Sequence, residues 1–98
     1  MKFEWDSKKE KINKQKHRVT FSEACYVFID KHSLTIFDDE HSGDGDRWIT
    51  MGQAPNGKVL VVVHTYRSIK GKESIRIISA RKATKNEVKQ YLERRATK

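Results

Sequence analysis

The sequence predicts an α+β fold, in which helices pack on an antiparallel sheet. Two patterns lead to this prediction: apolar residues recur at helical spacing near both ends of the chain, and they alternate along several segments between residues 33 and 83. The chain has 98 residues, of which 36% are hydrophobic and 35% are charged. This length and balance suit one small globular domain over residues 1–98 rather than a disordered chain.

The N-terminal segment is expected to form a short strand and then a helix. Phe3 and Trp5 alternate along residues 2–5, which favours a strand. Asp6 can then cap a helix over residues 7–17, because an aspartate side chain accepts hydrogen bonds from the free backbone N–H groups of a first helical turn. This helix has little apolar surface and is expected to lie on the outside of the protein.

Residues 19–30 are predicted to form a second helix. Thr20 and Glu23 have the spacing of a capping box, in which each side chain bonds to the backbone N–H of the other residue. The apolar residues of this segment recur at i, i+3, i+6 and i+7, which places them along one side of a helix. These residues are Phe21, Ala24, Val27 and Phe28.

Four strands are expected to follow as an antiparallel meander, with a last helix after them. Residues 38–46 are charged and contain two glycines, and therefore read as a loop. Asn56 and Gly57 favour a hairpin turn because both tolerate positive φ. Thr84 and Glu87 repeat the capping-box spacing and are expected to begin the C-terminal helix. The four predicted strands are residues 33–38, 47–54, 58–67 and 73–83.

Strict alternation along residues 73–83 would divide the basic side chains between the two faces of the sheet. Arg81 would lie on the same face as Ile77, whereas Arg76 and Lys82 would lie on the opposite face. The isoleucines are expected to hold this strand in the sheet, and the cations are expected to bind an anionic partner.

The positive charge is concentrated at the two ends of the chain. The net charge is +8. Residues 1–18 hold seven Lys and Arg against three Asp and Glu, residues 19–70 hold five against seven, and residues 71–98 hold nine against three. The ends can meet in the fold and form one basic surface, which favours nucleic acid as the partner. A solvated basic exterior and an acidic protein partner are the alternatives.

The sequence does not predict a metal site or a nucleophilic cysteine. No two of the four histidines, which are His17, His32, His41 and His64, lie at the short spacing typical of zinc ligands. Cys25 follows Ala24 in the second predicted helix, where a small buried thiol is the ordinary explanation. A single cysteine also forms no internal disulfide.

Several motifs resemble the BrnT toxin family of bacterial toxin–antitoxin systems. The family's opening pattern F-x-W-D…N-x-x-K-H…F-x-E-A, its R-W…G pattern and its closing motif I-R-I-I-S-A-R-x-A all occur in this sequence. The closing motif is matched without departure by residues 75–83, while the loop over residues 38–46 matches least. The two earlier motifs are matched by Phe3, Trp5, Asp6, Asn13, Lys16, His17, Phe21, Glu23, Ala24, Arg47, Trp48 and Gly52.

This resemblance implies a RelE-like fold: a curved antiparallel sheet, formed by the meander and a short N-terminal strand, with two N-terminal helices and a C-terminal helix packed on it. It also implies a ribonuclease that cuts RNA and inhibits translation. An antitoxin of the BrnA type, which carries a DNA-binding fold, would neutralise the toxin. The toxin–antitoxin complex would bind operator DNA and repress its own operon.

Such a ribonuclease would use the 2′-hydroxyl of RNA as the nucleophile, without a metal or other cofactor. We expect Arg67 and Arg81 to hold the phosphate, because a guanidinium makes two parallel hydrogen bonds to it. His64 and His17 are the candidate acid and base because imidazole titrates near pH ~6.5. Tyr91 is a candidate proton donor. Further RNA-binding candidates are Arg76, Lys16, Lys82, Tyr66 and Arg47.

The catalytic candidates also have structural explanations. His64 lies in an apolar strand and could equally be a core histidine. Tyr91 lies on the apolar side of the last helix, which favours packing, and His17 could end the first helix, where a cation suits the helix dipole. Glu23 and Glu73 are alternative bases, although the capping position of Glu23 counts against it.

Two other functions stay open at this point. One is a non-catalytic nucleic-acid-binding module, for which the sequence offers no helix-turn-helix and no exposed aromatic platform, since Trp5 and Trp48 are expected in the core. The other is a co-repressor that acts only together with its antitoxin. No signal peptide and no apolar run of about 20 residues is present, so a cytoplasmic protein without a membrane partner is expected.

Overall fold

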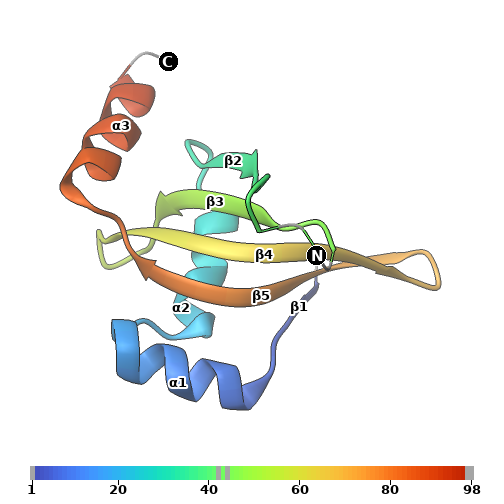
Figure 1. Cartoon of the computed structure of the whole chain (residues 1–98). Coiled ribbons are helices and arrows are strands. Elements are labelled where there is room, and N and C mark those ends of the chain that lie inside the picture. The colour runs from blue at the N-terminus through green and yellow to red at the C-terminus, as the bar shows by residue number, and fades with distance from the viewer. Residues whose placement is uncertain (1, 42, 44, 97–98) are drawn as a thin grey trace.

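The computed structural model describes residues 2–41, 43 and 45–96. These residues form one five-stranded sheet and three α-helices (Figure 1). In the same residues no helix is long and apolar enough to cross a membrane. The strands are β1 (Lys2–Glu4), β2 (Leu34–Phe37), β3 (Trp48–Gln53), β4 (Val59–Ile69) and β5 (Lys72–Lys82). The helices are α1 (Ser7–His17), α2 (Phe21–Ala24), the 3₁₀ helix η1 (Cys25–Ile29) and α3 (Lys85–Ala96).

The sheet is mixed, with the strand order β1-β5-β4-β3-β2. β2 to β5 form the predicted antiparallel meander, which is therefore confirmed. β1 pairs with β5 in the parallel sense, so the prediction of an antiparallel sheet is wrong at this edge. The physical reason is the path of the chain. β1 and β5 are joined by most of the chain, including α1, which runs below the edge of β5 (Figure 1), and not by a tight turn, so the connection does not require them to be antiparallel.

The first predicted helix is confirmed, and the second is wrong in part. The Asp6 side chain accepts a hydrogen bond from the backbone N–H of Lys8 at 2.8 Å and caps α1. The second segment is α-helical only from Phe21 to Ala24 and continues as the 3₁₀ helix η1. Its later residues are aromatic and β-branched, which are weak helix formers. η1 also packs very close to β3, which restricts the helical path there.

A glycine in β3 permits this close approach. A Cβ atom added to Gly52 would lie 2.9 Å from the carbonyl oxygen and 3.0 Å from Cβ of Val27 in η1. Such distances are shorter than van der Waals contact, so η1 can lie against β3 only because position 52 has no side chain.

The two hairpin turns follow from local sequence. Gly57, with a φ of 87°, completes the turn that Asn56 and Gly57 predict. The next turn is shorter than predicted, because β4 extends to Ile69 and β5 begins again at Lys72. Lys70 and Gly71, both with positive φ, form this two-residue turn, as the right-handed twist of a hairpin favours. The predicted loop 38–46 contains residues 42 and 44, which lie outside the described residues.

β5 contains a bulge at Ile78. Val63 of β4 pairs with Ser79, and the next residue, His64, pairs with Ile77. Ile78 therefore has no partner on β4, and β5 contains one more residue than β4 between these two pairs. A bulge of this kind shifts the alternation of side chains by one position.

The bulge places Arg76 and Arg81 on the same face of the sheet. Arg76 pairs with Thr65 and Arg81 pairs with Val61, and these two β4 residues have the same parity. The prediction that Arg81 shares a face with Ile77 is therefore wrong. Alternation without a bulge gave that result, and the sequence carries no clear sign of the extra residue.

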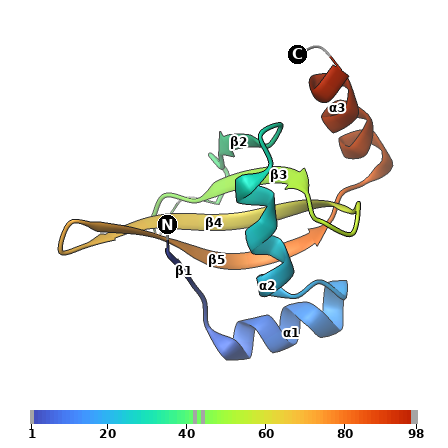
Figure 2. The ribbon, with the colours of Figure 1, turned by 180° about the vertical axis from the view of Figure 1, so that it is seen from behind.

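The two faces of the sheet differ in what covers them. We call one the helix-covered face, where α2 and η1 cross the strands (Figure 2) and α1 lies along the β5 edge. Its core includes Phe21, Val27, Leu60, Val62, Ile75, Ile77 and Ala80. We call the other the open face, because α3 contacts it at one end, where Tyr91 packs with Met51, Val59 and Val61. The open face continues along β4 and β5 with Thr65, Arg67, Arg76 and Arg81.

Candidate functional site

Three arginines lie on the open face, two of them close together. The Arg67 side chain crosses β5 and its Nη1 donates to Oε1 of Glu4 on β1 at 3.2 Å. This path takes the Arg67 guanidinium past Arg76, which lies between Glu4 and Thr65 in the strand register. Within the described residues Arg76 has no carboxylate at salt-bridge distance. These two arginines form a concentrated positive charge at one end of β5.

Arg81 lies further along the same face and makes a bidentate ion pair. Its Nη1 donates to Oε1 of Glu87 at 2.8 Å, and its Nη2 donates to Oε2 at 3.0 Å. The hydrogen bonds from Arg81 hold the pKa of Glu87 at about 2, and those to Glu87 raise the pKa of the guanidinium. Both side chains are partly exposed, at 41% for Arg81 and 28% for Glu87. The pair is therefore accessible from solvent and stays charged at neutral pH.

His17 and Lys16 lie beside the bulge. Together with Ile78 and Ser79 of β5 they line a cavity of about 210 Å³ between α1 and the strand. Ser79 pairs with Val63 and thus has the parity of the open face. The end of α1 therefore brings an imidazole and an ammonium group to the edge of the strand that carries Arg76 and Arg81.

His64 is fully buried on the helix-covered face. Its Nε2 lies 2.8 Å from Oγ1 of Thr50, and its ring packs edge-on against Phe28 at a centroid distance of 4.8 Å. Nδ1 has no hydrogen-bond partner among the described residues. Burial lowers the pKa of His64 to about 4, so the ring is neutral at pH 7. In this position the imidazole is on the opposite side of the sheet from the three arginines.

Tyr91 is also buried, with 1% of its surface exposed. Its hydroxyl donates to Oδ2 of Asp30 at 2.5 Å, and the backbone N–H of Gln53 donates to the same oxygen at 2.8 Å. Burial and the hydrogen bond to Asp30 raise the pKa of Tyr91 to about 12. Burial alone would raise the pKa of Asp30, but its hydrogen bonds outweigh burial and lower it. Tyr91 thus attaches α3 to the end of η1.

Tyr66 belongs to an aromatic cluster at the end of the helix-covered face that α2 does not reach. Its ring contacts Trp48 at a centroid distance of 5.7 Å, and Trp48 contacts Phe37 at 5.1 Å. Tyr66 and Phe37 are 51% and 38% exposed. The sequence does not predict this exposed cluster, because it favours a core position for Trp48. The cross-strand register, in which Phe37, Trp48 and His64 lie side by side, would have been needed to find it.

The remaining cationic candidates are Lys82 and Arg47. Lys82 pairs with Leu60 and thus belongs to the helix-covered side, opposite Arg76, which contradicts the predicted alternation. Arg47 is half-buried and lies just before β3. Its carbonyl accepts a hydrogen bond from the backbone N–H of Asp38, which closes the loop between β2 and β3.

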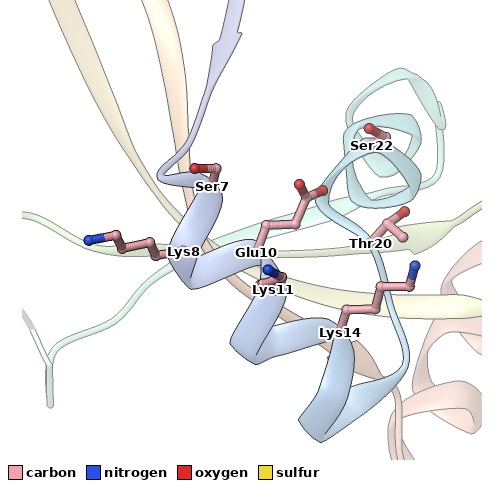
Figure 3. A pocket seen from close by; sticks show the side chains of 7 residues that line it. All are labelled: Ser7, Lys8, Glu10, Lys11, Lys14, Thr20 and Ser22. Carbon is pink, nitrogen blue, oxygen red and sulfur yellow. The ribbon is translucent and has the colours of Figure 1, made fainter.

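A groove lined by three lysines lies between α1 and the start of α2 (Figure 3). It has a volume of about 500 Å³. Glu10 points toward the start of α2, as Figure 3 shows, and its carboxylate accepts a hydrogen bond from the backbone N–H of Phe21 at 3.1 Å. Lys14 points toward Thr20, and Lys8 points away from the groove. Glu10 thus joins the two helices, and the lysines around it are solvated surface groups.

The described residues contain no cluster of three or more His, Cys, Asp or Glu side chains that could hold a metal ion. Cys25 is half-buried, its Sγ lies 3.2 Å from the carbonyl oxygen of Phe21, and burial raises the pKa of its thiol. A thiol with a raised pKa is a poor nucleophile at neutral pH.

Comparison with known proteins agrees with this arrangement of motifs. A family model described as the ribonuclease toxin BrnT of type II toxin–antitoxin systems matches residues 5–87. The chain belongs to the BrnT ribonuclease toxin family. The matched range includes Lys16, His17, Arg67, Arg76 and Arg81 and ends at the carboxylate that pairs with Arg81. Tyr91 lies beyond it.

The fold is also that of a BrnT protein. The chain is similar to the crystal structure of the Brucella abortus ribonuclease toxin BrnT, with a TM-score of 0.62 and 18% sequence identity. The alignment covers 87% of this chain and 99% of that one. Comparison with curated proteins finds no match. The α+β fold, predicted from the apolar patterns, and the membership of the BrnT family, predicted from the motifs, are therefore confirmed.

Proposed function

We propose that this BrnT-family protein is an endoribonuclease that cleaves RNA by attack of the 2′-hydroxyl on the adjacent phosphorus, without a metal ion. The attacking oxygen loses its proton to a base, the P–O5′ bond breaks, and the leaving 5′-oxygen takes up a proton. The products are a 2′,3′-cyclic phosphate and a 5′-hydroxyl. Cations are needed for the negative charge that gathers on the phosphorus oxygens.

The bulge at Ile78 is the observation that supports this proposal most. It brings Arg76 to the face that carries Arg81, and both lie on the strand bordered by His17. Their β4 partners are four residues apart, so the two arginines are about 13 Å apart along the strand. An RNA strand lying along β5 would contact both of them.

We assign the roles of the side chains from their positions. Arg76 and Arg81 bind the phosphates, and Arg67 adds positive charge beside Arg76. His17 exchanges protons with the reacting oxygens, and Lys16 attracts the backbone at the same edge. His64 and Tyr91 were candidates for acid and base, but their burial supports structural roles for both.

The partners follow from the family. In a type II system the antitoxin is a protein, and we propose that it is of the BrnA type, with a DNA-binding fold. The toxin–antitoxin complex would bind operator DNA and repress the operon. We further propose that residues 1–98 act as one domain in the cytoplasm. A relation to RelE-type toxins stays a prediction.

A cleavage assay in EDTA tests the proposed reaction. Purified protein is incubated with a structured RNA, and the ends of the products are identified. We expect cutting in EDTA with 2′,3′-cyclic phosphate ends, and a loss of at least about 100-fold in Arg76→Ala/Arg81→Ala, because two phosphate contacts are removed. The matched control is Lys31→Ala/Lys58→Ala, which removes two exposed cations from turns at other sites.

Each alternative has its own outcome in this assay. Products with 5′-phosphate ends, or cutting that requires a divalent metal, would contradict 2′-hydroxyl attack without metal. Salt-sensitive RNA binding with no cutting at any protein concentration would favour a nucleic-acid-binding module. Equal cutting by the double variant and the wild type would place the reaction elsewhere on the molecule.

A further inference from the structure

The ion pair between Arg81 and Glu87 leaves one edge of the guanidinium open. An arginine has five N–H donors in a planar fork. Nη1 donates to Oε1 of Glu87 at 2.8 Å and to the carbonyl of Lys82 at 3.3 Å, and Nη2 donates to Oε2 of Glu87 at 3.0 Å. Within the described residues, Nε and the second hydrogen of Nη2 have no acceptor. These two N–H groups point in parallel along one edge, which is the geometry that binds a phosphate.

Glu87 is itself held in place by the helix start. Its Oε1 accepts a hydrogen bond from the backbone N–H of Thr84 at 2.8 Å, and its own backbone N–H donates to Oγ1 of Thr84 at 3.2 Å. This is a complete capping box, so the carboxylate has a fixed position relative to the end of β5. An otherwise flexible arginine is thereby bound to a rigid group.

We propose that Glu87 is a positioning residue, which holds Arg81 with its Nε/Nη2 edge turned toward the RNA phosphate. This inference rests on the proposed function, and it assigns to Glu87 a role beyond capping α3. The carboxylate occupies the Nη1/Nη2 end of the fork, so phosphate and Glu87 can bind Arg81 at the same time. Orientation of the fork aligns its two N–H groups with the charge that develops on the phosphate in the transition state, so the benefit is expected in the cleavage rate and not in RNA binding.

The test compares Glu87→Gln with Glu93→Gln. Glutamine serves as well as glutamate in a capping box, so Glu87→Gln keeps the start of α3 but leaves one acceptor for Arg81. Glu93 lies on the same helix and is exposed, and its replacement makes the same charge change. We expect Glu87→Gln to lower the single-turnover cleavage rate at saturating RNA by about tenfold, with the RNA Kd changed by less than about threefold. Glu93→Gln should leave both within about twofold of wild type.

A double-mutant cycle separates positioning from a loss of fold. Arg81→Lys keeps the charge but removes the fork. If Glu87 acts through that fork, Glu87→Gln should lower the rate by less than about twofold in the Arg81→Lys background. The same tenfold loss in both backgrounds would mean that Glu87 acts through stability or through another residue, and would overturn the inference.

Further outcomes of the same measurements would contradict the role of Glu87 or the proposed function. Faster cleavage or tighter RNA binding by Glu87→Gln would show that the carboxylate competes with phosphate, and no change would show that Arg81 needs no orientation; either result overturns the inference. A wild-type protein that does not cleave would instead contradict the proposed function. The inference about Glu87 rests on that function and would be overturned with it, and this outcome is distinguished from the others by the inactive wild type.

Discussion

Polar side chains are buried on one face of the sheet and exposed to solvent on the other. On the helix-covered side, Asn13 and His64 are buried, and their hydrogen bonds are made to groups within the protein. On the open face, Arg67 and Arg81 pair with carboxylates but keep 47% and 41% of their side-chain surface exposed. A polar side chain in or against this sheet therefore has a structural role where helices cover it, and is available to a ligand where they do not. Four predictions test this division.

The largest effect is expected on the helix-covered side, at Asn13. Its amide donates to the carbonyls of Val19 and Ala80 and accepts from the backbone N–H of Ala80 at 3.1 Å, at a point where β5 has no strand partner on that side among the described residues. Asn13→Ala leaves three buried backbone groups unpaired, so the free energy of unfolding should fall by about 3–4 kcal/mol. Urea unfolding measures this, with Gln15→Ala, an exposed amide on α1, as the control. A loss below about 1 kcal/mol would mean that water replaces the side chain.

The second prediction concerns His64 and acid. Folding lowers its pKa from 6.5 to about 4, so between these pH values the unfolded chain binds a proton that the folded chain does not. Stability should therefore fall as the pH drops from about 6.5 to about 4, by up to about 3 kcal/mol for this residue. Because carboxylates also titrate there, the measured quantity is the difference from His64→Leu. Parallel stability curves for the two proteins would refute the assignment.

Tyr91 joins the two regions, since it lies in α3 on the open side and bonds to Asp30 at the end of η1. Tyr91→Phe removes this hydrogen bond and should lower the free energy of unfolding by about 1–2 kcal/mol, because the bond is to a charged group. Cleavage should stay within about twofold of wild type. Tyr26→Phe, at an exposed tyrosine, is the control. A large loss of cleavage in a stable Tyr91→Phe protein would restore Tyr91 as a proton donor.

The smallest effect on stability is expected on the open face, at Arg67. Its ion pair with Glu4 is exposed, so Arg67→Ala should lower the free energy of unfolding by only about 0.5 kcal/mol. If Arg67 contacts RNA, the dependence of log K on log salt should become shallower by about 0.7, the value for one phosphate on a single strand. Lys31→Ala should leave this slope unchanged. An unchanged slope in Arg67→Ala would remove Arg67 from the RNA-binding surface.

Local signals in the sequence predicted the elements well, but not how long each lasts. Thr20–Glu23 and Thr84–Glu87 have the same spacing, and both threonines cap a helix. α2 ends after four residues, and its Glu23 carboxylate accepts a hydrogen bond from the side chain of Asn56, in the turn between β3 and β4, at 2.6 Å. α3 runs for twelve residues, and its Glu87 carboxylate accepts a hydrogen bond from the backbone N–H of Thr84. A cap marks the start of a helix, while tertiary contacts decide its length.

The candidate site was predictable in its residue types and only partly in its arrangement. The motifs indicated Arg81, His17 and their neighbours, because residue identity is visible in the sequence. The pairing of Arg81 with Glu87 and the burial of His64 depend on contacts between distant segments, which alternation alone does not give. Glu87 was seen as a cap, and its second contact becomes visible only when the end of β5 and the start of α3 are placed together.

The bulge at Ile78 has a consequence for the spacing of residues along β5. Arg76 and Arg81 are separated by five positions, an odd number, which in a regular strand means opposite sides. Ile78 acts as a silent position in the count and makes the effective separation even. Insertion of one further paired residue between Arg76 and Arg81 would make the effective separation odd and turn Arg81 toward the helix-covered face, whereas deletion of Ile78 would remove the bulge and leave both arginines on the open face. The length of the closing motif therefore matters as well as its residues, and insertion of one residue there is expected to be more damaging than deletion of Ile78.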